Sequence, residues 1–247
     1  MDPPYYEKRK NNCGNYWKNL KKFNKKIKIV RLTDEYKPTK HNVDILINDY
    51  PYSENFINIY KNSNSAKKYF LGYKSFLYPI HHKVIYKKNS TFFVAFGGAD
   101  SNFLVDKLNP TLNKIKMKKI IFVRKNKVNY YNSINKNKKF NDYISIKDQD
   151  DFFNKIKMCK FFISTPSNIM FEAAYFGQSG IVIPTQTRQK KMIKFFEKKK
   201  IVKSHIKIKD LNEDIILKDF KSLNKEKFKI NQKKIKIYQK RMIQSII

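Results

Sequence analysis

Glycine is scarce in this sequence, with 6 among 247 residues where average usage of about 7% predicts roughly 17. Cys13 and Cys159 are too few and too isolated for a disulfide framework or a metal cluster. The four histidines have no metal-ligand spacing, so we expect neither a metal site nor a cofactor. The chain shows no apolar signal segment at its start and no run near the roughly 20 apolar residues of a membrane span. These absences predict a cytoplasmic protein.

Acidic residues are also few: Lys and Arg outnumber Asp and Glu by 54 to 20, which gives a formal net charge of +34. A lysine-rich surface attracts polyanions, so one interpretation is a basic, non-enzymatic nucleic-acid-binding protein. The other enriched residues, Asn, Ile, Tyr and Phe, are those that AT-rich codons specify, and the lysines run along the whole chain. We therefore interpret the charge mainly as a matter of composition and keep nucleic-acid binding as an alternative.

Hydrophobic residues make up 41% of the chain, enough for a sizeable core. Short apolar segments alternate with helical ones, which is typical of an α/β fold with parallel strands. We expect loop and helix between 48 and 75, strands at 27–32, 43–47, 91–96, 119–124, 144–146, 161–164 and 181–183, and helices at 104–116, 150–159, 168–176, 189–198 and 226–247.

A polar break at 87–90 divides the alternating pattern. We expect a first domain over residues 1–88, a second over 89–225 and a C-terminal helix over 226–247. Phe228, Ile235, Tyr238 and Met242 share one face of that helix, which predicts that it packs on the core.

Two junctions between a strand and a helix carry the candidate chemistry. The first strand ends in Gly97-Gly98-Ala99-Asp100, where paired glycines let the backbone approach a ligand closely. A tight turn that needs glycine is the alternative. After the second strand, Ser164, Thr165, Ser167 and Asn168 place hydroxyl and amide groups at a helix N-terminus, which suits a diphosphate.

Glu172 lies one helical turn beyond Asn168, on an otherwise apolar helix. A carboxylate there can bridge two vicinal hydroxyls, as carboxylates do with ribose in dinucleotide-binding folds. Compensation of the helix dipole is the alternative role for this residue.

The second junction and its surroundings resemble a known family. The matching residues are Ile163 to Ser167, Phe171 to Ala174, Gly177, Ile181 to Pro184, Gln186 and Gln189. They resemble the donor-nucleotide half of GT-B glycosyltransferases of the peptidoglycan N-acetylglucosaminyltransferase type. The nucleotide-sugar hydrolases of pseudaminic-acid biosynthesis and their spore-coat-polysaccharide relatives are the closer match. Further matches, in order over roughly residues 15 to 200, are Asp34-Glu35, 43–48, 71–79 and Gly97 to Asp100.

The resemblance implies a GT-B-like α/β fold, with a truncated N-terminal Rossmann-like domain and a complete C-terminal one built on a parallel sheet. It also implies a nucleotide-diphospho-sugar ligand, most simply a UDP-sugar. Glu172 would take the ribose hydroxyls, Ser167 and Asn168 the diphosphate, and Gln189 would face the sugar. Ser164 belongs to the same junction, and Gly97, Gly98 and Asp100 form the loop that approaches the phosphates.

Two departures from the family pattern leave the activity open. The family begins with a Gly-x-Gly-His-x-x-Arg loop, whose histidine is thought to activate water, and nothing before Ile27 resembles it. Arg188-Gln189 stands in place of the usual Asn-Gln pair near the sugar, and neither His81 nor His82 has the spacing of a substitute base. No catalytic residue is therefore assigned.

The leading hypothesis is a nucleotide-sugar-binding protein of surface-glycan or nonulosonic-acid biosynthesis, either a hydrolase, a glycosyltransferase or an inactive relative. The alternatives are the nucleic-acid-binding protein and a non-catalytic partner subunit of a glycan enzyme. If the nucleotide-sugar-binding protein is active, a separately encoded partner chain would complete its truncated N-terminal domain.

Overall fold

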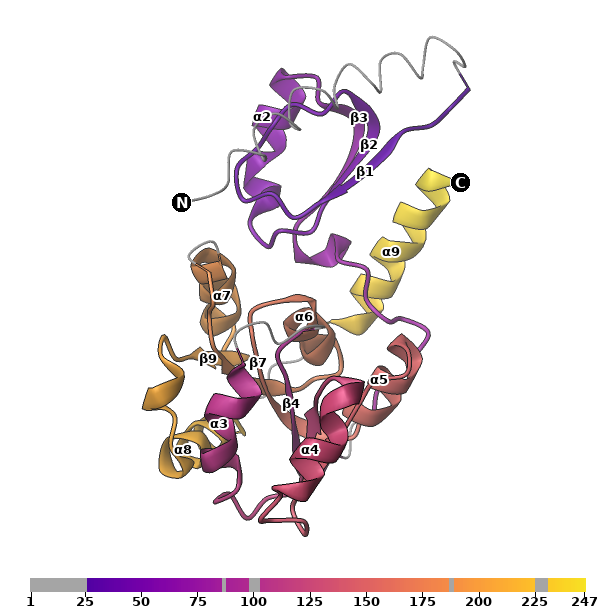
Figure 1. The fold of residues 1–247 in the computed structure, drawn as a ribbon. Coiled ribbons are helices and arrows are strands. Elements are labelled where there is room, and N and C mark those ends of the chain that lie inside the picture. Colours follow the sequence, from indigo (N-terminus) through magenta and orange to yellow (C-terminus); the bar gives the residue numbers. More distant parts are fainter. Residues whose placement is uncertain (1–25, 86–87, 98–102, 187–188, 225–230) are drawn as a thin grey trace. The chain divides into compact units, whose positions relative to one another are not determined.

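The structure is a computed structural model that describes residues 26–85, 88–97, 103–186, 189–224 and 231–247. The chain divides into two compact units (Figure 1). Unit 1 consists of Met1–Leu77 and Lys233–Ile247, and unit 2 of Tyr78–Gln232. The domain limits expected after residues 88 and 225 stay predictions.

Unit 1 contains a three-stranded parallel sheet in the order β1-β2-β3. Its strands are β1 (Val30–Thr33), β2 (Val43–Asn48) and β3 (Ala66–Leu71). The central strand β2 is buried at every position, whereas β1 alternates between exposed and half-buried residues, as expected for an edge strand. Short helical segments follow the strands: η1 (Ser53–Phe56), α2 (Ile57–Asn62) and η2 (Tyr73–Ser75).

Helices cover both faces of this small sheet. On one face Tyr60 of α2 is buried with Leu46 and Leu71. On the other face Met242 of α9 (Gln232–Ile246) packs with Ile45, Ile47 and Phe70, and Tyr238 packs beside them. The expected packing of the C-terminal helix on the core is confirmed for Ile235, Tyr238 and Met242, while Phe228 lies outside the described residues.

Unit 2 contains a six-stranded parallel sheet in the order β6-β5-β4-β7-β8-β9. Its strands are β4 (Asn89–Ala95), β5 (Lys119–Phe122), β6 (Asn141–Ile144), β7 (Cys159–Ser164), β8 (Ser179–Val182) and β9 (Val202–Ser204). The connecting helices are α3 (Leu104–Leu112), α4 (Val128–Ser133), α5 (Gln149–Ile156), α6 (Asn168–Tyr175), α7 (Gln189–Lys198) and α8 (Glu213–Asn224), with short η3 (Lys125–Lys127) and η4 (Ile208–Asp210).

The central strands β4 and β7 bury side chains on both faces, and both are apolar runs in the sequence. On one face Phe220 of α8 stacks on Phe161, with ring centroids 4.5 Å apart, and contacts Phe92 at 5.2 Å. On the other face Phe93 stacks on Phe162 and meets Phe152 of α5 edge-on. Adjacent residues of one strand therefore serve opposite layers of the core.

The α/β fold with parallel strands expected from the sequence is confirmed. The structure contains two strands and two α-helices that were not expected: β3, β9, α4 and α8. Strand β6 spans Asn141–Ile144, whereas the sequence predicted a strand over residues 144–146. No helix among the described residues is long and apolar enough to cross a membrane.

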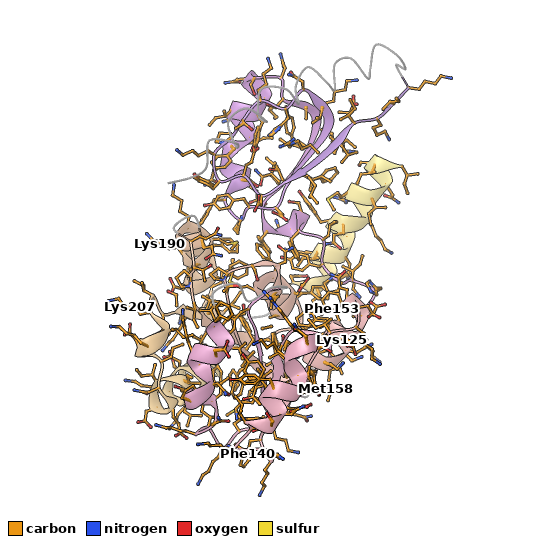
Figure 2. The ribbon with its side chains drawn as sticks, viewed as in Figure 1. Lys125, Phe140, Phe153, Met158, Lys190 and Lys207 are labelled. Carbon is orange, nitrogen blue, oxygen red and sulfur yellow. The ribbon has the colours of Figure 1, made fainter. Side chains whose placement is uncertain are left out.

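Exposed lysines occur on several elements of unit 2. Figure 2 labels Lys125 in η3, Lys190 in α7 and Lys207 just before η4, and all three are exposed. This distribution agrees with the interpretation that the charge is spread over the chain.

Candidate functional site

The strand order of unit 2 reverses direction between β4 and β7. From β4 the chain proceeds outward through β5 and β6, and from β7 it proceeds the other way through β8 and β9. In open parallel sheets, ligands bind in the crevice at the carboxyl ends of the two strands that flank such a switch point. Ala95 of β4 pairs with Ser164 of β7, so these two carboxyl ends are in register. Both junctions singled out in the sequence begin at this position.

Gly97 follows β4 and has a backbone φ of +83°, which residues other than glycine rarely adopt. A Cβ at this position would have no described atom within 4 Å. The glycine therefore serves the backbone turn and leaves open space beside the main chain. Gly98 and Asp100 lie outside the described residues, and their roles stay predictions.

The loop after β7 leads into α6 without a side-chain cap. Ser164 is fully buried, and its hydroxyl donates to the carbonyl oxygen of Thr165 at 2.6 Å. Ser167 has extended backbone at the N-cap position, but its hydroxyl bonds the Thr165 carbonyl at 3.3 Å and makes no capping bond to α6. Asn168, the first residue of α6, is exposed. Met170 N–H donates to the carbonyl oxygen of Ser167 at 3.0 Å, so the first amides of α6 that can bind an anion are those of Asn168 and Ile169.

Glu172 lies beyond the first turn of α6 and is only 7% exposed. Burial raises the pKa of its carboxyl to about 7, and a hydrogen bond from Gln149 opposes this rise. Compensation of the helix dipole does not fit, because α6 has no acidic residue in its first turn. A carboxyl group that is half protonated near neutral pH can donate or accept hydrogen bonds.

Gln189, the first residue of α7, joins two loops at the same edge of the sheet. Its Oε1 accepts hydrogen bonds from the backbone N–H groups of Thr185 (2.8 Å) and Gln186 (3.0 Å). Its Nε2 donates to the carbonyl oxygen of Pro166 at 3.1 Å. The side chain thus fixes the β8–α7 loop against the β7–α6 loop. Contact with a sugar stays a prediction, and Arg188 lies outside the described residues.

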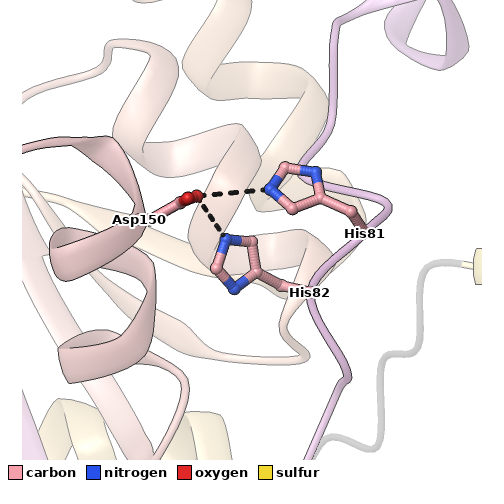
Figure 3. A group of neighbouring side chains, drawn as sticks. All are labelled: His81, His82 and Asp150. Carbon is pink, nitrogen blue, oxygen red and sulfur yellow. Dashed lines mark hydrogen bonds and ion pairs between the residues drawn. The ribbon is translucent and has the colours of Figure 1, made fainter.

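A cluster that the sequence did not predict joins His81, His82 and Asp150 (Figure 3). Oδ1 of Asp150 lies 2.9 Å from Nε2 of His82 and 3.3 Å from Nε2 of His81. Hydrogen bonds from His82 and His81 lower the pKa of Asp150. The residues are 68 and 69 positions apart in the sequence, so no local spacing could have indicated the cluster.

Unit 1 has a separate group of acidic residues after its strands. Asp34 and Glu35 follow β1, and Asp49 follows β2. Burial and the neighbouring Asp34 raise the pKa of Asp49 to about 7. Glu35 accepts hydrogen bonds from Thr39 and lies 3.0 Å from Nε2 of His41. Although burial opposes them, hydrogen bonds with His41 and Thr39 hold the pKa of Glu35 below its usual value.

No family model and no curated protein matches this sequence. Among solved structures, MurG of Acinetobacter baumannii is similar with a TM-score of 0.55 at 13% identity, over 97% of this chain and 81% of that chain. LpCGTa in complex with UDP has a TM-score of 0.48 at 14% identity, over 83% of this chain and 50% of that chain. Os79 from O. sativa, in complex with UDP and deoxynivalenol-3-glucoside, has a TM-score of 0.48 at 15% identity, over 82% and 49%.

The chain therefore spans about half the length of LpCGTa and Os79 and more of MurG. The likeness to MurG shows the fold: an α/β protein of the GT-B type, with a three-stranded and a six-stranded parallel sheet. The GT-B-like fold expected from the sequence is confirmed.

Proposed function

We propose that unit 2 binds a nucleotide-diphospho-sugar, such as a UDP-sugar, at the switch point between β4 and β7. The observation that carries the proposal is the meeting of two features there: the glycine turn after β4 and the uncapped N-terminus of α6 after β7. Free amides at a helix N-terminus and close backbone approach are what a diphosphate requires.

Each expected residue has a place in this proposal. Ser167 and Asn168 hold the diphosphate at the start of α6, and Gly97, Gly98 and Asp100 would contact its phosphates. Glu172 bonds the ribose hydroxyls, Ser164 shapes the β7 end, and Gln189 orders the loop nearest the sugar. The UDP bound by LpCGTa and Os79 is a ligand of this chemical class.

By resemblance, we propose that the protein acts on nucleotide sugars in surface-glycan biosynthesis, as a hydrolase of the pseudaminic-acid type or a GT-B transferase. Water or an acceptor hydroxyl would attack the anomeric carbon and displace the nucleoside diphosphate, or water would attack the β-phosphorus and displace the nucleoside monophosphate. In each case the attacking oxygen would release its proton to solvent. The amides of α6 would stabilise the charge that develops on the departing phosphate. The resemblance of Gly97 to Asp100 and of Ser164 to Glu172 to the family supports this assignment.

Calorimetric titration with UDP and with UDP-N-acetylhexosamines tests the binding. Ser167→Asp is the informative variant, because aspartate is a good N-cap that keeps α6 stable and places a negative charge where the diphosphate would sit. Asn212→Asp is the control: Asn212 caps the start of α8 by accepting from Ile215 N–H, so this substitution also places one negative charge at a helix N-cap.

We expect Ser167→Asp to weaken UDP binding at least tenfold and Asn212→Asp to leave it unchanged. Absence of heat at millimolar UDP and UDP-N-acetylhexosamine would refute the proposal, as would an equal effect of both variants.

A further inference from the structure

The segment that carries His81 and His82 is fixed on unit 2 by a turn and by aromatic packing. His82 N–H donates to the carbonyl oxygen of Pro79 at 3.0 Å, which closes the turn. Neighbouring side chains of an extended chain point to opposite sides, whereas this turn directs both imidazoles toward α5 (Figure 3). The ring centroids of the two histidines are 4.4 Å apart.

The imidazole of His82 packs against aromatic side chains of unit 2. Its ring meets Phe153 edge-on at 5.0 Å and Phe176 at 6.4 Å, and its side chain is 10% exposed. The preceding Tyr78 stacks on Tyr175 at 5.4 Å. His82 therefore has little freedom to turn its Nε2 away from Asp150.

Asp150 differs from the two acidic residues beside it. Asp148 accepts from Asp151 N–H at 2.7 Å and caps α5, and Asp151 pairs with Lys155. Among the residues that the structure describes, the Asp150 carboxylate hydrogen-bonds with the two histidines only. Its place in the first turn of α5 favours the ionised form of the carboxylate.

We propose that His81, His82 and Asp150 bind one divalent transition-metal ion of the Zn²⁺ class. One ring nitrogen of each histidine and a carboxylate oxygen of Asp150 all lie within 4.8 Å of one another. Zinc bonds of about 2.0–2.2 Å in a tetrahedral site place ligand atoms roughly 3.3 Å apart. The two Nε2–Oδ1 distances of 2.9 and 3.3 Å are already close to that separation.

The donor set decides the class of ion. Two imidazole nitrogens and one carboxylate suit Zn²⁺, Co²⁺, Ni²⁺ or Cu²⁺, whereas Mg²⁺ and Ca²⁺ prefer oxygen ligands throughout. Three protein ligands leave a fourth position for water. The side chains of His81 and Asp150 are 66% and 70% exposed, so an ion can reach the site from solvent. Bound there, it joins the segment 78–82 to the start of α5.

Metal binding is measured on the full chain after removal of any affinity tag and treatment with chelator. Zn²⁺ is titrated in competition with a chromophoric chelator, and Co²⁺ is titrated for its visible absorption. Salt near 0.2 M limits repulsion of the cation by the positive protein, since the Debye length is then below about 8 Å. UDP is omitted, so the outcome is independent of the nucleotide-sugar proposal.

His81→Ala and Asp150→Asn are the informative variants, because both side chains are exposed and their loss leaves the core intact. His205→Ala and Asp214→Asn are the matched controls. His205 pairs with Asp219 at 2.7 Å in another part of unit 2, and Asp214 is an exposed residue in the first turn of α8.

We expect one Zn²⁺ per chain and a Co²⁺ spectrum of low coordination number. Each informative variant should weaken binding at least tenfold, and each control should leave it unchanged. Zn²⁺ should also shift the ring NMR signals of His81 and His82 but not those of His205. The proposal is overturned if all variants bind Zn²⁺ with equal affinity, which would mean that the ion binds elsewhere in the chain. It is also overturned if the protein does not bind Zn²⁺ at 0.1 mM.

Discussion

Glu172 should make the stability of unit 2 depend on pH in an unusual direction. Its pKa is raised by burial from 4.5 to about 7, so the folded protein holds this proton more tightly than the unfolded chain does. The stabilisation is therefore complete below pH 4.5 and is lost as the pH rises toward 7. Most carboxylates that are paired in folded proteins have the opposite effect.

The magnitude follows from the size of the shift. Each pKa unit corresponds to about 1.4 kcal/mol, so the change from 4.5 to about 7 amounts to roughly 3 kcal/mol. Glu172→Gln keeps the shape and the contact with Gln149 but removes the charge. At pH 8 the variant should be more stable than the unmodified protein by up to about 3 kcal/mol, and near pH 4.5 the two should agree within about 1 kcal/mol.

Urea unfolding followed by far-ultraviolet circular dichroism at pH 5, 6, 7 and 8 measures this difference. Subtracting the unfolding free energies of the two proteins at each pH cancels the contribution of every other titrating group. Asp49 of unit 1, which also has a raised pKa, is one of these groups. Asp214→Asn, an exposed substitution on α8, is the control and should follow the unmodified protein at every pH. Parallel profiles of Glu172→Gln and the unmodified protein would show that the carboxyl group does not titrate as argued.

Three further predictions concern other buried positions. A Cβ at Gly180 would lie 2.3 Å from the carbonyl oxygen of Phe162, so Gly180→Ala should lower the unfolding free energy of unit 2 by about 2–3 kcal/mol in urea; a loss below about 1 kcal/mol would contradict the packing. Burial lowers the pKa of Lys119 to about 8, so the free energy of unfolding should rise by roughly 2–3 kcal/mol between pH 8 and 10. Thermal unfolding measures this rise, which should be absent in Lys119→Met. Unit 1 should lose roughly 3 kcal/mol of stability between pH 4 and 7 as the half-buried Asp49 ionises, and Asp49→Asn should remove this loss. The variant should therefore show slower amide exchange of β2 at pH 7, and unchanged exchange would argue against a raised pKa of Asp49.

Much of the fold of unit 2 could be predicted because its central strands are buried on both faces. Phe92 to Phe96 and Phe161 to Ile163 are continuous apolar runs, which only a covered parallel sheet explains well. The edge strands lack this signal. β3 begins Ala66-Lys67-Lys68 with two exposed lysines, and β9 is three residues long, so neither stands out from a loop.

The candidate site could be predicted in part for the same reason. Gly97 and the residues from Ser164 to Asn168 each follow a strong strand signal, and strand order alone brings them together. The histidine cluster could not be predicted, because the partner carboxylate of His81 and His82 comes from α5, far along the chain. The hydrogen bonds of Gln189 to two loops were likewise beyond any pattern of residue types.

Because helix α9 follows unit 2 in the sequence, unit 1 can complete its fold only after unit 2 has been synthesised. Met242 and Tyr238 complete one face of its sheet, over Ile45, Ile47 and Phe70. A ribosome releases α9 only after every strand of unit 2, so unit 2 can fold during synthesis while unit 1 stays incomplete. Without α9 the side chains of Ile45, Ile47 and Phe70 would lose the cover of Met242 and Tyr238 and be exposed to water, which costs free energy. The nascent chain would thus present that face to solvent until α9 has left the ribosome, and proteolytic loss of α9 alone would destabilise unit 1 while unit 2 survives.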